Sequence, residues 1–315
     1  MPTSVLNINT KFRNNYANTK STDFIYNLPF QMKNVSSMKY VSAEFANDPY
    51  SLNSNYGSNN FKIIDKADGD AVHNLVIQEG NYSGVDLAKE IKTKITELGL
   101  TNHNNVAGNN KAIIDVSFNN HTRKFNFTRE VGSSVADPNT INFDLDFTYN
   151  KALTAPEANS YTTNFKTINE QHLSLGWIMG FRKKVYTFAD DYKLTDDITY
   201  GKYKKGLSSE SQYDKNGSRY YMLMINDYNN NHKNVVISSY QQDTLVDNNV
   251  MAKLKYVVDS DDNSVDTECC LEVKREYTGN VNINRLQIRL IDEYGRIVDL
   301  NEMDFSFALE VETDE

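Results

Sequence analysis

The chain has 315 residues, a formal net charge of -9 and 39% hydrophobic residues, with 20 Tyr and 15 Phe. The excess of acidic residues argues against a nucleic-acid-binding surface, which needs clustered Lys and Arg, so we expect no direct nucleic-acid binding. No stretch approaches the ~20 consecutive apolar residues of a membrane-spanning helix, so we also expect no membrane span. The length allows one large β domain or two ordinary domains, and the aromatic residues suffice for a substantial core.

Residues 1–20 have the pattern of an extended N-terminal arm. Apolar residues alternate with asparagine at the start of this segment, and a polar run follows. Because so few apolar residues cannot form a core of their own, we expect the arm to be either disordered or docked onto a neighbouring surface. The candidate assembly contacts in the arm are Leu6, Ile8, Lys11, Phe12 and Arg13.

The rest of the chain, residues 21–315, contains many short runs in which apolar and polar residues alternate. This period of two is typical of half-buried β-strands. The first strand is expected to end at Pro29, because proline has no N–H group for the hydrogen-bond ladder. Strands are predicted at 24–28, 35–45, 61–64, 75–78, 113–118, 125–127, 143–147, 220–225, 251–258 and 271–273.

One helix is predicted, near residues 85–98. Ser83 and Asp86 have the spacing of a capping box, apolar residues recur on one face, and Gly99 ends the segment. We expect this helix to cover an open end or an edge of a β-sandwich.

The segment from Leu173 to Phe181 predicts a central strand. Its alternate residues are large and apolar, while the opposite face carries Gly176 and Gly180. Glycine in a strand allows another backbone to approach closely. Close packing within the sandwich is the preferred interpretation, and a subunit contact is the alternative, which adds Gly176 and Gly180 to the candidate assembly contacts.

The stretch from Arg285 to Val311 has the clearest strand pattern in the chain. Its apolar residues alternate with polar and charged ones in two runs, which predicts the inner face of a β-sandwich. The residues of this face are Leu286, Ile288, Leu290, Phe305, Phe307, Leu309 and Val311. The expected fold is therefore an all-β, antiparallel jelly-roll sandwich with one short helix and long loops. We expect 21–315 to form a single jelly-roll domain, with a loop insertion around 183–219.

No catalytic, cofactor-binding or metal-binding set stands out in the sequence. The five histidines lack a ligand partner at the spacing of a zinc site, and no nucleotide-binding or hydrolase motif is present. Asp144 and Asp146 are interpreted as outward strand residues, with a carboxylate pair or a calcium site as the alternative. The loop residues Asp259, Asp261 and Asp262 lack the spacing of a calcium-binding loop. We therefore expect no enzymatic activity and no cofactor.

Several segments, taken in order, resemble the single jelly-roll penton and minor capsid proteins of nucleocytoplasmic large DNA viruses. The resemblance covers the arm and first strands, the glycine-rich entry to the helix, the glycine-containing segment and the closing strands. The segments are NINTKFRNN with STDFIYNLPFQMKNVSSMKYVSAEF, IQEGNYSGVDLAKEI, LSLGWIMGFR, and REYTGNVNINRLQIRLIDEYGRIVDLNEMDFSFALEVE. The resemblance does not extend to the loops 101–110, 183–219 and 226–249, where we expect virus-specific decoration or an inserted subdomain.

This resemblance implies a structural capsid protein of a large icosahedral DNA virus. It implies a homopentamer at the five-fold vertex, whose partners are trimers of the major capsid protein and other minor capsid proteins. The expected location is the vertex of the virion, with assembly in the host cell cytoplasm. The chain is too short for two jelly rolls, which favours a penton over a major capsid protein.

Two alternatives remain open on the sequence. One is a related minor capsid protein. The other is a jelly-roll carbohydrate-binding module at the virion surface, in which exposed tyrosines stack on sugars. The candidate tyrosines are Tyr186, Tyr192, Tyr200, Tyr203 and Tyr213.

Overall fold

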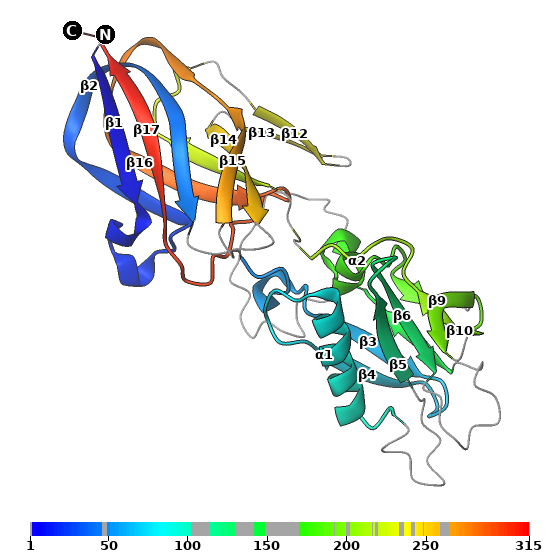
Figure 1. The fold of residues 1–315 in the computed structure, drawn as a ribbon. Helices are drawn as coiled ribbons and strands as arrows, with labels where there is room; N and C mark the ends of the chain where they lie inside the picture. Colours follow the sequence, from blue (N-terminus) through cyan, green and yellow to red (C-terminus); the bar gives the residue numbers. More distant parts are fainter. Residues whose placement is uncertain are drawn as a thin grey trace. The chain divides into compact units, whose positions relative to one another are not determined.

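In the computed structural model, the chain forms two compact units (Figure 1). The terminal unit contains the described residues of 1–50 and 218–315, and the inserted unit contains those of 51–217. The residues that the structure describes are 2–45, 49–101, 114–129, 142–148, 170–191, 193–199, 202–215, 217, 220–232, 236–240, 243–247, 249–258 and 265–314.

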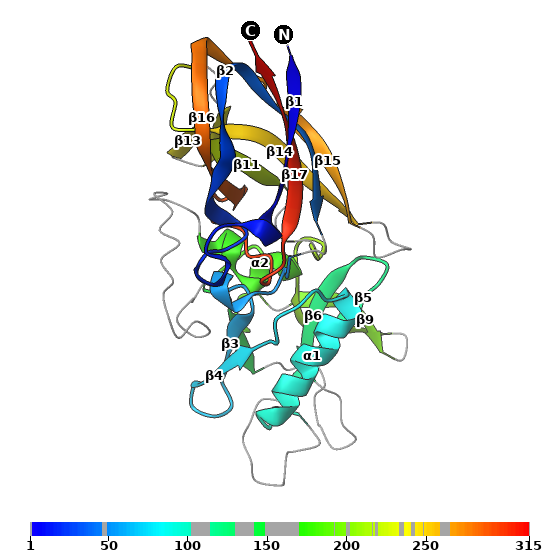
Figure 2. The same cartoon turned by 90° about the vertical axis from the view of Figure 1, so that its left-hand side faces the viewer.

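The terminal unit is built on one antiparallel sheet with the strand order β1-β17-β2-β16-β11-β14-β15. The strands are β1 (Thr3–Asn9), β2 (Asp23–Phe45), β11 (Tyr221–Asn226), β14 (Val250–Val258), β15 (Val265–Glu272), β16 (Arg275–Asp292) and β17 (Phe305–Thr313). A separate hairpin pairs β12 (Val236–Tyr240) with β13 (Asp243–Asp247). The long strand β2 pairs with both β16 and β17, and β15 also lies beside β2, so the sheet curls around its own inner face (Figure 2). This arrangement confirms the predicted all-β, antiparallel jelly-roll class.

The inner face of this curled sheet is the core of the terminal unit. The apolar residues predicted from β16 and β17 all belong to it, and each is at most 3% exposed. Burying one such side chain stabilises the fold by about 1.5–3 kcal/mol. Phe45 and Phe305 stack at 4.9 Å between ring centroids, which joins the ends of β2 and β17. The predicted inner face is therefore confirmed.

The predicted arm is wrong for residues 3–9, because they form strand β1. This strand pairs with β17 in an unbroken register from Thr3 opposite Glu312 to Asn9 opposite Ser306. Ile8 is only 1% exposed and belongs to the core of the terminal unit. β17 supplies both the hydrogen-bond ladder and part of the core, so two apolar residues are enough to hold the strand.

The expected strand end at Pro29 is also wrong, since β2 continues through it. Pairing with β16 shifts register between Asn27, opposite Arg285, and Met32, opposite Ile283. Proline is tolerated at such an irregularity because its missing N–H is not needed there.

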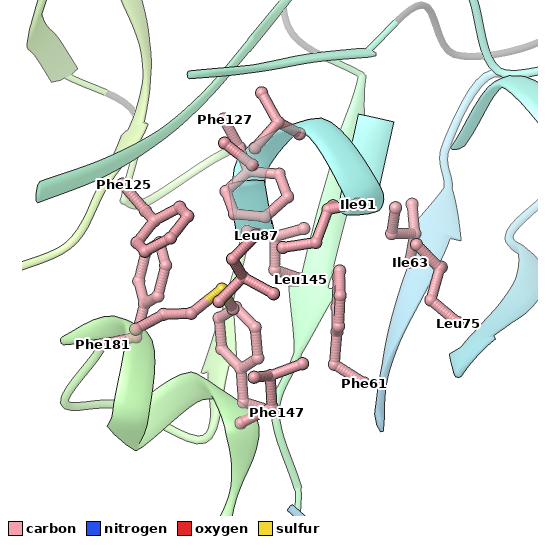
Figure 3. Close-up of a cluster of buried hydrophobic side chains, with 14 of the residues drawn as sticks. Phe61, Ile63, Leu75, Leu87, Ile91, Phe125, Phe127, Leu145, Phe147 and Phe181 are labelled. Atoms are coloured by element: carbon pink, nitrogen blue, oxygen red, sulfur yellow. The ribbon is translucent and has the colours of Figure 1, made fainter. Parts of the chain in front are cut away.

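The inserted unit has two four-stranded antiparallel sheets, with the orders β4-β3-β7-β8 and β5-β6-β10-β9. The first comprises β3 (Asn60–Asp65), β4 (Ala71–Val76), β7 (Phe143–Asp146) and β8 (Val185–Tyr186). The second comprises β5 (Ile114–Asn119), β6 (Lys124–Arg129), β9 (Lys193–Thr199) and β10 (Lys202–Ser208). Both contribute to a separate aromatic-rich core (Figure 3). The structure therefore shows two units in place of the expected single domain with an insertion around 183–219, and the second unit consists of the described residues between 51 and 217.

Helix α1 (Gly84–Glu97) confirms the predicted helix and its cap. The Ser83 hydroxyl accepts a hydrogen bond from the Asp86 N–H at 3.1 Å, which satisfies one free donor of the first turn. Leu87 and Ile91 point into the core of the inserted unit (Figure 3). The expectation that the helix covers the sandwich formed by the C-terminal strands is therefore wrong.

The predicted strand at 173–181 is instead the short helix α2 (Leu175–Met179). Ser174 caps its start by accepting from the Trp177 N–H at 3.3 Å. Gly180 ends it with a φ of 98°, a left-handed conformation that favours glycine. These two caps override the period-two pattern of the apolar residues.

Candidate assembly surface

The described residues offer little reaction chemistry. Within the described ranges, no group of three or more His, Cys, Asp or Glu side chains is arranged to hold a metal ion. Asp144 accepts from the Phe188 N–H at 2.9 Å and pairs with Lys66 at 3.2 Å. Asp146 accepts from the Thr148 N–H at 2.8 Å. Both carboxylates thus serve local structure, and the Asp259–Asp262 segment lies outside the described residues.

Two of the tyrosines considered for sugar stacking are buried. Tyr186 is 2% exposed and donates to Glu210 at 2.6 Å, and Tyr213 is 5% exposed and donates to the Tyr82 carbonyl at 2.9 Å. Neither can offer a ring face to a ligand. Tyr192, Tyr200 and the side chain of Tyr203 lie outside the described part of the chain.

An ordered corner follows β1, and we call residues 10–22 the N-terminal corner. It contains two short 3₁₀ turns, Thr10–Phe12 and Tyr16–Asn18. Arg13 is buried at its centre, where its guanidinium contacts Asp304 at 2.5 Å and donates to the Thr19 carbonyl at 3.0 Å.

The same carboxylate holds two further side chains of the corner. Asp304 accepts from the Thr10 hydroxyl at 2.9 Å and from the Tyr16 hydroxyl at 3.1 Å. The Arg13 guanidinium also lies 3.9 Å from the centre of the Tyr16 ring. Charge-assisted hydrogen bonds of this kind fix the corner to the loop before β17.

The corner presents an aromatic side chain to solvent. Phe12 is 73% exposed, and Tyr16, four residues further along the chain, is 49% exposed. Lys11, between Thr10 and Phe12, is also exposed. An aromatic side chain held outward on an ordered turn is available for contact with another molecule, and aromatic residues are enriched in protein–protein interfaces.

The outer face of β1, β17 and β2 is mainly polar, with isolated apolar residues. Val5 on β1 is 65% exposed, and Phe30 and Val41 on β2 are 68% and 49% exposed. Their charged neighbours are paired: Lys39 meets Glu310 at 3.0 Å, and Lys274 meets Glu312 at 2.9 Å. This surface was not identified from the sequence. A signal was present, because Val5 and Val41 each adjoin a residue of the inner face, and successive side chains of a strand point to opposite faces.

The seven candidate assembly residues fall into three groups. Leu6 is half-buried and Ile8 buried in the core of the terminal unit, and Arg13 is bound to Asp304 within the chain. A side chain on Gly176 would overlap the Phe147 ring, and one on Gly180 would overlap the Ser211 carbonyl. Both glycines therefore serve packing within the inserted unit. Lys11 and Phe12 are exposed, and their role in assembly stays a prediction.

No family model matches the chain, and no curated protein matches it. Among solved structures, the mavirus penton protein aligns over 100% of both chains with a TM-score of 0.42 and 11% identity. A chain of the Sputnik virophage structure aligns over 99% of this chain and 98% of its own length, with a TM-score of 0.41 and 10% identity. Likeness at this level does not assign a function to this chain.

Among the described helices, none has both the length and the apolar character that crossing a bilayer requires.

Proposed function

We propose that the chain is a structural capsid protein, the penton subunit at the five-fold vertex of a large icosahedral DNA virus. The observation that carries this proposal is the N-terminal corner, which holds Phe12 outward by means of the Arg13–Asp304 pair. An ordered, exposed aromatic residue next to a neutral strand suits protein–protein contact better than catalysis.

The ordered resemblance of segments from Asn7 to Glu312 supports a capsid role over other assembly functions. In this proposal the chain forms a homopentamer and contacts major capsid protein trimers and other minor capsid proteins. Five identical heterologous contacts close such a ring. The protein resides in the virion, is assembled in the host cell cytoplasm and has no enzymatic role.

A Phe12→Ser variant tests the contact. We expect it to remain folded, because the ring is exposed, yet to enter particles at a lower copy number per capsid. Quantitative mass spectrometry of purified particles measures this ratio. The matched control is Phe188→Ser, an exposed phenylalanine of the inserted unit, which should leave the ratio unchanged. Wild-type incorporation of Phe12→Ser would contradict the role of the corner.

A further inference from the structure

Strand β1 is the open edge of the curled sheet in the terminal unit. It stands at one end of the strand order, while β15 at the other end lies beside β2. Among the described strands, none pairs with the outer edge of β1. Five of its seven residues are exposed: Thr3, Ser4, Val5, Asn7 and Asn9.

This edge lacks the features that normally prevent pairing between sheets. Natural edge strands are blocked by charged residues, proline or bulges. β1 has the sequence TSVLNIN, without charge or proline, and its register with β17 is unbroken over all seven residues. By contrast, β15 carries Asp266, Glu268 and Glu272, and its pairing with β14 is interrupted.

The charges beside β1 are already neutralised within the chain. Val5 lies opposite Glu310, which pairs with Lys39, and Thr3 lies opposite Glu312, which pairs with Lys274. A second strand at this edge would therefore meet no unpaired carboxylate from β17.

We propose that β1 pairs with β1 of a second copy, in antiparallel orientation about a two-fold axis. In a register centred on Leu6, Val5 lies opposite Asn7 of the second copy. The Leu6 residues of the two copies lie opposite each other on the inner face. All cross-strand pairs are neutral, so no like charges oppose one another. The half-buried Leu6 side chain gains further burial.

This pairing goes beyond the proposed vertex role. A two-fold contact closes after two copies, whereas a five-fold ring needs a heterologous contact. In this proposal the pair forms when the chain is outside the vertex, and it covers an edge that would otherwise attract other strands. The formal charge of -9 on each copy opposes pairing, so added salt strengthens it.

Charge substitutions on the exposed face of β1 test the pairing in the full-length chain. Val5→Lys with Asn7→Lys places like charges across the two-fold axis, and Val5→Glu with Asn7→Glu does the same with the opposite sign. We expect each double variant alone to dimerise roughly tenfold more weakly than wild type. An equimolar mixture of the two should restore the dimer, because lysine then faces glutamate. Sedimentation velocity measures all three samples, and circular dichroism checks that each is folded.

The matched control is Val72→Lys with Asn74→Lys on β4, an edge strand of the inserted unit that also carries no Asp, Glu, Lys or Arg. We expect this control to dimerise like wild type. A monomeric wild type across the concentration range would overturn the proposal. So would dissociation by the β4 variant alone, or a mixture of the β1 variants that stays monomeric.

Discussion

The terminal unit contains a buried ion pair. Arg275 and Asp227 meet at 2.7 Å, and each side chain is 1% exposed. Arg275 also donates to the Ile225 carbonyl at 2.8 Å, and the Tyr277 hydroxyl donates to Asp227. The pair joins the loop after β11 to the first residue of β16. Such a pair is costly to break, because the remaining charge cannot reach water.

Asp227→Ala should destabilise the terminal unit by about 3–5 kcal/mol, since it leaves the Arg275 guanidinium buried without its carboxylate. Urea unfolding measures the loss. The control is Asp23→Ala, which breaks the exposed Arg289–Asp23 pair and should cost at most about 1 kcal/mol. Equal costs for the two variants would show that the buried pair contributes no more than a surface pair.

His232 beside this pair gives the terminal unit a pH dependence. The residue is buried, and within the described residues neither ring nitrogen has a hydrogen-bond partner. Burial, together with the nearby Arg275, lowers the pKa of His232 below 6.5, while Asp227 acts in the opposite direction. The Tyr277 ring lies 6.1 Å away between centroids. The folded chain therefore favours the neutral imidazole.

As the pH falls below the ordinary histidine pKa, His232 takes up a proton more readily in the unfolded chain than in the folded chain. The free energy of unfolding therefore decreases with falling pH between the ordinary pKa and the lowered pKa of the folded state. His232→Gln should reduce this loss. Urea midpoints for wild type and variant, measured on either side of pH 6.5, check the difference. Parallel pH curves for the two proteins would rule out His232 as the source.

At the scale of elements, the start of α1 depends on one side chain. Ser83 accepts from the Asp86 N–H and donates to its carboxylate at 2.6 Å. Ser83→Ala should cost ~1 kcal/mol through loss of this cap. Thr93→Ala, on the exposed face of the same helix, should be neutral or slightly stabilising because alanine is the better helix former. Chemical unfolding of the inserted unit separates the two, and a neutral Ser83→Ala would refute the cap.

Two substitutions on opposite faces of β1 test whether residues 3–9 form a strand. Ile8→Ala should destabilise the terminal unit by roughly 2–5 kcal/mol, because it opens a cavity in the core. Val5→Ala, on the solvent face, should change stability by at most about 0.5 kcal/mol. Thermal unfolding of both variants gives the comparison. Equal, small effects would mean that residues 3–9 behave as a free arm.

The sequence predicted those elements whose signals are local. The strands β16 and β17 could be recognised from the alternation of apolar and polar residues within each segment. The helix α1 could be recognised from Ser83 at its start and Gly99 after its end. The segment 175–179 carried two conflicting local signals, and its caps decided the outcome. The partner of Arg13 could not be found in this way, because Asp304 lies 291 positions away along the chain.

At the scale of the whole molecule, the division into two units left no mark on the sequence. Each unit is rich in strands and each has its own apolar core, so the alternation of apolar and polar residues did not reveal that the inserted unit begins at Ser51. The terminal unit brings both chain ends together, since β1 and β17 are paired (Figure 1). The corner and the open edge of β1 are both on this unit, which makes it the expected site of contact with other subunits.

The most direct test of the vertex assignment is a cryo-electron microscopy reconstruction of the intact particle at a resolution that shows side chains. We predict that five copies of this chain surround each five-fold axis, with the Phe12 corner buried against a neighbouring subunit. A map in which another chain occupies every vertex, with this chain absent or confined to other positions, would contradict the penton role.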